Sequence, residues 1–271
     1  MKNTIIITLS FLFCLNIMAA PENMSSFPIV EEVSFTNQGT VISGSLVLPN
    51  TTSLCPAIII IDGSGKTQRK MEYAREIAKK GVAVLTYDKR GVGKSGGKYK
   101  GRRNASFENL NLLAGDAVAG IEILTTHEKI DKQRIGIWAG SQAGWIAPLA
   151  ASISSNISFM VLLSSPSVPV SQEMRYSKLT NNDPEFLENH TPEQIESELG
   201  KKSIFQLFQS DFNPLPYLEK IDMPVLWIYG EKDRSIPVST CINILNNLKK
   251  DNFQIKTYPD SGHSLRFLKG K

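Results

Sequence analysis

The chain has 271 residues, of which 41% are hydrophobic and 21% charged, and its net charge is +4. A chain of this length can bury one sizeable core, and these proportions are ordinary for a soluble globular protein. A net charge this small gives no reason to expect nucleic acid as a partner, and we attribute the basic excess to solubility.

The first twenty residues differ from the rest. Lys2 precedes an apolar run over 4–18 that is too short to span a bilayer, and small residues follow that run. This order is typical of a secretory signal peptide. We therefore expect residues 1–19 to be removed and residues 20–271 to form one domain. The mature protein is then expected to be exported from a bacterial cell, periplasmic or secreted, with no stable membrane insertion.

The three cysteines give no disulfide framework. Cys14 lies in the expected signal peptide, and Phe13 before it is too bulky for a lipidation site. An oxidising compartment would allow a bond between Cys55 and Cys241. Two separate buried thiols are nevertheless the default expectation.

Short apolar stretches alternate with helical ones along the mature chain. Alternating residues on either side of Asn37-Gln38-Gly39 predict a hairpin, with strands at 30–35 and 41–48. Mostly apolar runs predict buried strands at 57–61, 82–87, 135–138, 159–163, 225–229 and 253–258. Helical spacing predicts helices at 71–80, 110–125, 144–153 and 238–249. This alternation predicts an α/β fold, with a doubly wound, mostly parallel sheet after the hairpin.

Residues 165–213 interrupt the alternation. They are rich in proline and contain no strong strand, and within them 193–208 has the pattern of a polar-faced helix. A long excursion between two core strands is more often a lid than a second domain. We expect a short helical cap insertion here, and the alternative is a surface insertion without function.

Two glycine-lysine motifs, Gly65-Lys66-Thr67 and Gly93-Lys94-Ser95, resemble the end of a phosphate-binding P-loop. Such a loop needs another glycine five positions before the first glycine of each motif, and the chain has Ile60 and Asp88 there. Both loops are too short to wrap around phosphates, so we do not expect a nucleotide hydrolase.

The stretch AGSQAG puts Ser141 between a predicted strand and a predicted helix. A nucleophile elbow forms in this setting, and it requires small residues two positions before and after the serine. Those positions hold Ala139 and Ala143 instead of glycines, with Gly140 and Gly144 one place off. The steric requirement is met although the literal motif fails. A purely structural turn is the alternative.

A serine becomes a good nucleophile only when a base takes its proton. Of the three histidines, His263 follows the last predicted strand, at the sheet edge where α/β sites assemble. His127 follows a helix and is expected at the surface. His190 falls in the expected cap, where it could at most touch substrate. His263 is therefore the predicted base.

The base in turn needs an orienting carboxylate. Asp233 follows the strand at 225–229 and reaches the same edge of the sheet. Asp260 lies only three residues before His263 and would have to fold back, and Glu231 is a weaker rival. The chain order serine, aspartate, histidine is the order expected for an α/β-hydrolase triad.

Backbone N–H groups must also face the substrate carbonyl oxygen as it gains charge. Gln142, directly after the serine, offers one N–H at the start of the helix. The loop at 62–65 follows the first central strand, and Ser64 is best placed to offer the other. A plain glycine-rich turn is the alternative for this loop.

Together these stretches resemble the α/β-hydrolases, and specifically the secreted bacterial group related to serine aminopeptidases and prolyl-oligopeptidase-like hydrolases. The resemblance rests on DGSG at 62–65, YDKRGVGKSGG at 87–97, RIGIWAGSQAGWIAPLA at 134–150, YGEKD at 229–233 and SGH at 261–263. It implies a nucleophile at Ser141, an acid at Asp233 and a base at His263. It also implies an oxyanion hole formed by the amides of Ser64 and Gln142.

The chain departs from that family at two positions. Asp62 stands where the family usually has histidine, which puts a negative charge near the oxyanion hole, and Ala143 stands where it usually has glycine. No metal or organic cofactor is implied, because no cluster of side chains has metal-ligand spacing.

The expected activity is a serine hydrolase acting on a small-molecule ester or a short peptide. We favour small esters, because the cap is short and no second domain gates the site. One alternative is an aminopeptidase on the same triad, with the substrate amine held by an acidic pair from Glu173, Asp183, Glu185 and Glu188. Another is a binding protein that keeps the fold without turnover.

Overall fold

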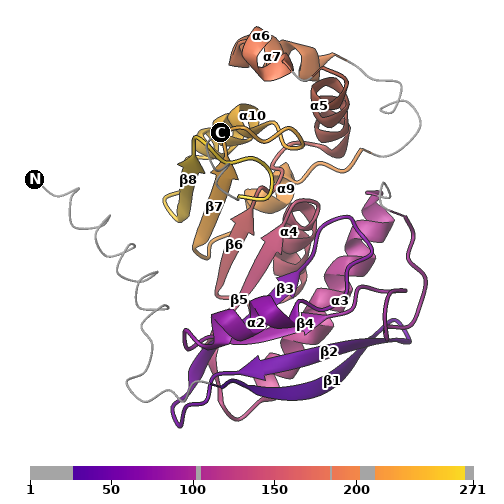
Figure 1. Ribbon diagram of the computed structural model, residues 1–271, viewed down its shortest axis with the longest axis vertical. Helices are drawn as coiled ribbons and strands as arrows, with labels where there is room; N and C mark the ends of the chain where they lie inside the picture. Colours follow the sequence, from indigo (N-terminus) through magenta and orange to yellow (C-terminus); the bar gives the residue numbers. More distant parts are fainter. Residues whose placement is uncertain (1–26, 102–104, 184, 202–210, 266–271) are drawn as a thin grey trace, which may run out of the picture.

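The computed structural model describes residues 27–101, 105–183, 185–201 and 211–265. Its centre is an eight-stranded sheet in the order β1-β2-β4-β3-β5-β6-β7-β8. The strands are β1 (Ile29–Asn37), β2 (Thr40–Leu48), β3 (Cys55–Ile61), β4 (Ala83–Tyr87), β5 (Ile130–Gly140), β6 (Phe159–Leu163), β7 (Val225–Gly230) and β8 (Phe253–Tyr258). The β1–β2 and β2–β4 pairs are antiparallel, and all other pairs are parallel. The predicted hairpin and mostly parallel sheet are confirmed (Figure 1).

The central strand β3 is buried along its whole length because both faces of the sheet are covered. In β3, Ala57, Ile59 and Ile61 contribute to one hydrophobic core, whereas Ile58 and Ile60 contribute to the other. Successive side chains of a strand point to opposite faces, so a strand between two cores needs apolar residues at every position.

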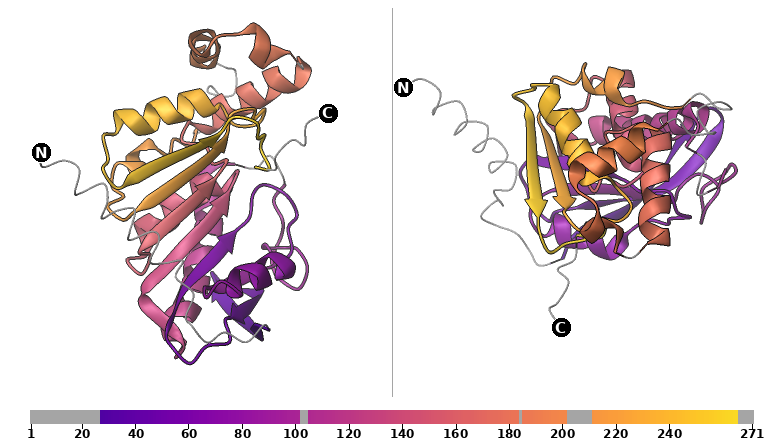
Figure 2. Two further views of the ribbon diagram at one scale, coloured as in Figure 1. Left: turned by 60° about the vertical axis from the view of Figure 1, so that its left-hand side comes forward. Right: turned by 90° about the horizontal axis from the view of Figure 1, so that it is seen from above.

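Helices pack on both faces of the sheet (Figure 2). The larger core joins α3 (Phe107–Thr126), α4 (Ala143–Ile153) and α10 (Val238–Asn247) to one face. The smaller core joins α2 (Met71–Ala78) to the other face. The four helices predicted outside residues 165–213 are therefore present within about one turn of their predicted ends, and the doubly wound arrangement is confirmed.

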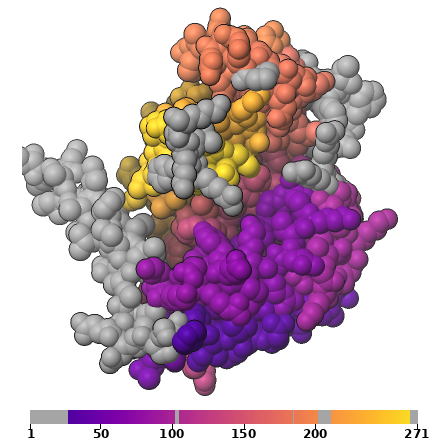
Figure 3. All heavy atoms as spheres, viewed as in Figure 1, coloured from indigo at the N-terminus to yellow at the C-terminus, as the bar shows by residue number. Residues whose placement is uncertain are grey.

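Helices replace strands between β6 and β7: α5 (Val170–Asn182), α6 (Phe186–Asn189), α7 (Pro192–Gly200) and α9 (Leu215–Leu218). We call residues 170–201 the cap. It has a small core of its own, formed by Tyr176, Phe186, Ile195 and Leu199. Its atoms form the upper end of the molecule in Figure 3. The helix predicted at 193–208 is confirmed as far as Gly200, and 202–210 lie outside the described residues.

The structure describes both cysteines of the expected mature chain. Cys55 in β3 and Cys241 in α10 are buried, free thiols. The expectation of two separate buried thiols is confirmed. The signal peptide predicted at 1–19 lies outside the described residues. None of the helices in the described ranges is long and apolar enough to cross a membrane.

Candidate active site

Ser141 lies in the turn between β5 and α4, at the carboxyl edge of the parallel strands. Its φ of 55° is in the left-handed region, which a residue with a side chain adopts only at a cost. The turn is held in place because the Ser141 N–H donates to the Leu163 carbonyl (3.1 Å) and the Gly144 N–H donates to the Ser141 carbonyl (2.8 Å). The predicted strand, sharp turn and helix are therefore present, with the backbone strain typical of a nucleophile elbow.

The small residues around Ser141 are not equally important. A Cβ atom on Gly144 would lie 2.4 Å from the Cβ of Ser165, whereas a Cβ atom on Gly140 would meet only the Leu163 carbonyl oxygen at 3.5 Å. Ala143 is completely buried within the larger core. Its methyl group therefore packs beneath the turn and is not exposed where a substrate would bind.

Asp233 and His263 come together across the turns that follow β7 and β8. His263 Nδ1 lies 2.8 Å from Asp233 Oδ2. Asp233 is completely buried, and its Oδ1 accepts the N–H groups of Ser235 (2.7 Å) and Ile236 (2.9 Å). A carboxylate fixed in this way holds the imidazole proton on Nδ1, which leaves Nε2 able to accept a proton.

The rival acids are engaged elsewhere. Asp260 Oδ1 accepts from Lys232 Nζ (3.1 Å), and Glu231 Oε1 accepts from the Thr257 hydroxyl (2.6 Å). Neither has a hydrogen bond with His263 in the described part of the chain. The structure thus selects Asp233 as the carboxylate partner of this imidazole.

The other two histidines lie apart from this pair. His127 Nε2 is 3.2 Å from Glu31 Oε2, at the edge of the sheet that β1 forms. His190 stacks on the Phe186 ring at 4.2 Å between centroids, and its Nδ1 is 2.9 Å from the Phe186 carbonyl oxygen. Both rings therefore have structural contacts of their own, and neither replaces His263.

Ser141 and His263 have no hydrogen bond to each other in the described residues. Catalytic hydrogen bonds are often long or poorly aligned before substrate is bound. The structure brings the predicted acid and base together and leaves the predicted nucleophile unbonded to the base.

The turn after β7 carries Asp233, and we call it the acid turn. Helix α5 of the cap contacts this turn. The Tyr176 hydroxyl donates to the Asp233 carbonyl at 2.8 Å, and Glu173 lies one turn earlier on the same helix. Burial raises the pKa of Glu173 to about 7, with His263 lowering it and Asp233 raising it. Burial lowers the pKa of His263, but Asp233 and Glu173 together hold it above its ordinary value.

Only one of the four acids that the sequence suggested for amine binding interacts electrostatically with this pair. Glu185 and Glu188 are exposed on the cap surface, and the Asp183 side chain accepts the Glu185 N–H at 3.0 Å. Glu173 is half-buried and makes no ion pair with lysine or arginine in the described ranges. The acidic pair predicted for an aminopeptidase is therefore reduced to a single carboxylate.

The loop at 62–65 lies directly against the serine turn. A Cβ atom on Gly63 would be 3.1 Å from the Ser141 Cβ and 3.6 Å from its Oγ. The N–H groups of Ser64 and Gln142 donate no hydrogen bond to any other described group. One of these N–H groups follows Ser141 directly and the other lies in the loop that contacts it, so both are available for an oxyanion hole.

The carbonyl groups of this loop are bound, in contrast to the two N–H groups. Lys89 Nζ donates to the Gly63 carbonyl at 2.5 Å, and the Tyr99 hydroxyl donates to the Ser64 carbonyl at 2.6 Å. The sequence assigned no role to either residue, although both belong to the loop that follows the strand at 82–87. Asp62 pairs with Lys70 Nζ at 2.5 Å, so its negative charge is balanced.

The described residues contain no group of three or more histidine, cysteine, aspartate or glutamate side chains that could hold a metal ion. What the arrangement can do chemically is nucleophilic acyl transfer: a strained serine, an imidazole oriented by a buried carboxylate, and two free amides.

Several solved hydrolases share this fold. An esterase from Pyrococcus furiosus is 22% identical, with a TM-score of 0.60 over 91% of this chain and 90% of its own. Acetyl xylan esterase 1 from Thermoanaerobacterium is 20% identical, with a TM-score of 0.62 over 94% of this chain and 87% of its own. An acylaminoacyl peptidase from Pyrococcus horikoshii is 18% identical, with a TM-score of 0.62 over 88% of this chain but 38% of its own.

At these identities the structural likeness establishes the α/β-hydrolase fold and nothing finer. The family is established by the sequence itself. The model of the prolyl oligopeptidase family matches residues 68–270, well over half of the chain, and this range includes Ser141, Asp233 and His263. The chain therefore belongs to the prolyl oligopeptidase family of α/β-hydrolases.

Proposed function

We propose that this protein is a serine hydrolase that cleaves small esters through an acyl-enzyme. The observation that carries the proposal is the contact between the His263 imidazole and the buried Asp233 carboxylate, on the same sheet edge as the strained Ser141. A purely structural contact would not need a serine in a left-handed turn at the same edge of the sheet, with two N–H groups that lack a partner in the described residues.

In the proposed reaction, the Ser141 hydroxyl attacks the ester carbonyl while His263 Nε2 takes its proton. Asp233 holds the imidazole and stabilises its protonated form. The carbonyl oxygen gains negative charge, and the amides of Ser64 and Gln142 receive it. His263 then returns the proton to the leaving alcohol. Water, activated by the same histidine, attacks the acyl group and releases the acid.

Small esters are favoured by the structural neighbours and by the short cap. Two of the neighbours described above are esterases of similar length to this chain. The described cap consists of short helices. This chain matches only 38% of the length of the acylaminoacyl peptidase, whereas it matches 90% and 87% of the two esterases. The half-buried carboxylate of Glu173 disfavours an acyl group that carries its own negative charge, because like charges repel strongly where water is excluded.

Glu173 also supports the second candidate function, an aminopeptidase. A half-buried carboxylate without an ion-pair partner in the described ranges would attract the ammonium group of a peptide substrate. A single carboxylate gives weaker recognition of an ammonium than the acidic pair that an aminopeptidase would use. We therefore keep peptide hydrolysis as the second candidate.

The first experiment asks whether the protein is a serine hydrolase at all. A fluorophosphonate probe is expected to label the wild type and to leave Ser141→Ala unlabelled. Ser152→Ala is the matched control, because Ser152 lies exposed on the same helix and is expected to label normally. A wild type that stays unlabelled favours the binding-protein alternative, and a Ser141→Ala variant that labels equally shows that Ser141 is not the nucleophile. Either result refutes the proposal.

The second experiment separates the two activities. A series of short-chain nitrophenyl esters is compared with aminoacyl anilides for wild type and Glu173→Gln. We expect efficient ester cleavage that Glu173→Gln retains. Anilide cleavage that Glu173→Gln abolishes would establish the aminopeptidase instead.

We further propose that the protein works outside the bacterial cytoplasm, on the strength of the N-terminal sequence alone. The mass of the protein recovered from periplasm and medium is expected to lack residues 1–19. A protein recovered from the cytoplasm with its N-terminus intact would refute export.

A further inference from the structure

The loop that is proposed to carry one half of the oxyanion hole is bound by a lysine. Lys89 is only 7% exposed, and its Nζ donates to the Gly63 carbonyl at 2.5 Å. No carboxylate of the described ranges lies within ion-pair distance of it. A buried lysine without an ion pair is uncommon, because burying a charge is costly. Its one strong contact is with the backbone of this loop.

The geometry of a peptide unit makes that contact significant. The carbonyl of Gly63 and the N–H of Ser64 belong to one peptide group, and the described chain contains no cis peptide bond. In a planar trans peptide the C=O and the N–H point in opposite directions. An ammonium group that fixes the Gly63 oxygen therefore also fixes the direction of the Ser64 N–H. It polarises the same peptide group, which makes that N–H a stronger donor.

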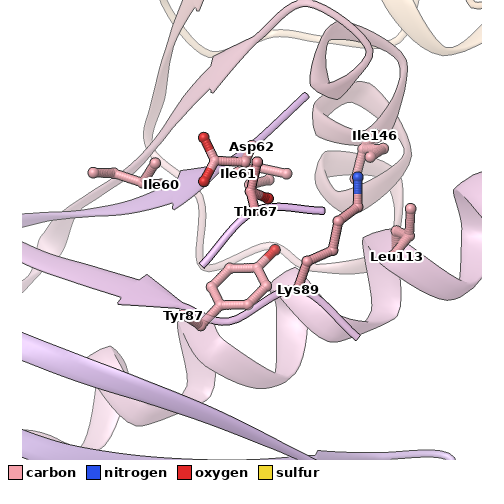
Figure 4. Close-up of a pocket in the computed structure, with 8 residues that line it drawn as sticks. All are labelled: Ile60, Ile61, Asp62, Thr67, Tyr87, Lys89, Leu113 and Ile146. Atoms are coloured by element: carbon pink, nitrogen blue, oxygen red, sulfur yellow. The ribbon is translucent and has the colours of Figure 1, made fainter. Parts of the chain in front are cut away.

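The surroundings of Lys89 leave little freedom for other arrangements. Figure 4 shows its extended side chain among the residues that line a cavity of about 10 Å³, which is room for about one water molecule. A second cavity of the same size lies beside Lys89 and is lined in part by Tyr99 and Gln142. Neither cavity could admit a substrate, and the hydrogen bond to the Gly63 carbonyl directs the amine toward the loop.

We propose that Lys89 is a positioning residue that orients the Ser64 N–H toward the oxyanion by binding the Gly63 carbonyl. This inference rests on the proposed function, since it requires an acyl-transfer reaction at Ser141. Lys89 touches neither the substrate nor the reacting atoms in this scheme. It acts through the peptide group between Gly63 and Ser64.

The charge state of Lys89 gives the proposal a pH signature. Burial lowers the pKa of its ammonium group to about 8, and Asp62 acts in the opposite direction. A neutral amine is a weaker donor than an ammonium. The ionisable groups that line the two cavities with Lys89 are Asp62, Tyr87, Arg90, Lys98, Tyr99 and Lys100. Turnover is therefore expected to decline to a lower plateau as the pH rises past about 8.

The test compares Lys89→Met with Lys250→Met. Lys250 Nζ also donates to a backbone carbonyl, that of Ile221 at 2.7 Å, and its side chain is only 16% exposed, but it lies beside β8 away from the serine turn. Deleting one oxyanion donor costs about 10²–10³-fold in kcat, so misdirecting one is expected to cost about 10- to 100-fold. We expect this loss for Lys89→Met with KM nearly unchanged, and no loss for Lys250→Met.

The pH profile and a second variant separate positioning from stability. Lys89→Met is expected to lose the decline above pH 8 that the wild type shows. Lys89→Arg keeps a cationic donor, and its kcat is expected to lie between those of Lys89→Met and the wild type. If Lys89→Met does not fold, Lys89→Arg is compared with the wild type instead. Wild-type kcat in folded Lys89→Met, or no regain of kcat in folded Lys89→Arg, would overturn the proposal. A wild type that fails to react with fluorophosphonate refutes the proposed function instead, so the two failures are distinguishable.

Discussion

Gly144 provides a direct test of how the serine turn is built. The change is Gly144→Ala, at a position in the first turn of α4 whose backbone does not need a glycine conformation. The obstacle is purely steric: the new Cβ would lie 2.4 Å from the Ser165 Cβ and 3.0 Å from the Pro166 Cδ. Ser165 is completely buried, and its carbonyl accepts the Tyr229 hydroxyl at 2.8 Å, so it cannot move aside freely.

The size of the effect follows from these distances. An ordinary contact begins near 3.4 Å, so the turn and Ser165 must separate by about 1 Å. Overpacking of this kind costs about 1–3 kcal/mol, and the better helix propensity of alanine returns up to about 1 kcal/mol. We expect a net loss of about 1–2 kcal/mol, or about 2–4 °C of Tm for each kcal/mol. A 1 Å displacement at a catalytic group can cost about 10²-fold in rate. Because the serine turn and the Ser165 segment share the displacement, we expect Gly144→Ala to lower kcat by about 10-fold.

Thermal unfolding and nitrophenyl ester turnover measure the two effects. Gly140→Ala is the matched control, because its Cβ would meet nothing closer than 3.5 Å and it should behave like the wild type. The reasoning is refuted if Gly144→Ala keeps wild-type stability and turnover, or if Gly140→Ala loses as much.

Two further substitutions test the acid–base pair. In Asp233→Asn the amide oxygen can still accept the Ser235 and Ile236 N–H groups, and the variant is therefore expected to fold. The amide nitrogen then faces His263 and imposes the wrong imidazole tautomer. We expect kcat, measured at neutral pH, to fall about 10⁴-fold. A loss below tenfold would exclude Asp233 as the orienting acid. In Glu173→Gln a negative charge that raises the pKa of His263 is removed. Because the base must be unprotonated to act, the acidic limb of the kcat/KM profile should move to lower pH, and an unmoved or upward-shifted limb contradicts the placement of Glu173.

The predictions from the sequence succeeded where each depended on a local pattern. Apolar runs such as Ala57–Ile61 reflect burial between two layers of helices, because a strand covered on both faces needs apolar residues at nearly every position. Asp233 and His263 follow successive parallel strands, and such strands end at the same edge of a sheet. Their proximity thus follows from the order of elements alone.

The rest depended on contacts that no local pattern specifies. Glu173 was one of four equivalent candidates, and only the packing of α5 on the acid turn, through Tyr176, distinguishes it. Lys89 lies in the stretch at 87–97 that resembles a family motif. Nothing in that motif indicates that the Lys89 side chain is buried. A buried lysine bound to a backbone carbonyl looks in sequence like any surface lysine.

The structure also relates two features that the sequence left separate. Asp62 departs from the histidine that the family usually has, and a carboxylate beside an oxyanion hole should oppose the reaction. Here its charge is balanced by Lys70, and the same carboxylate raises the pKa of Lys89 against the effect of burial. Without Asp62, burial would drive the amine further toward its neutral form at physiological pH. The departure at Asp62 therefore favours the charged lysine that we propose orients the hole, and the two residues form one electrostatic arrangement.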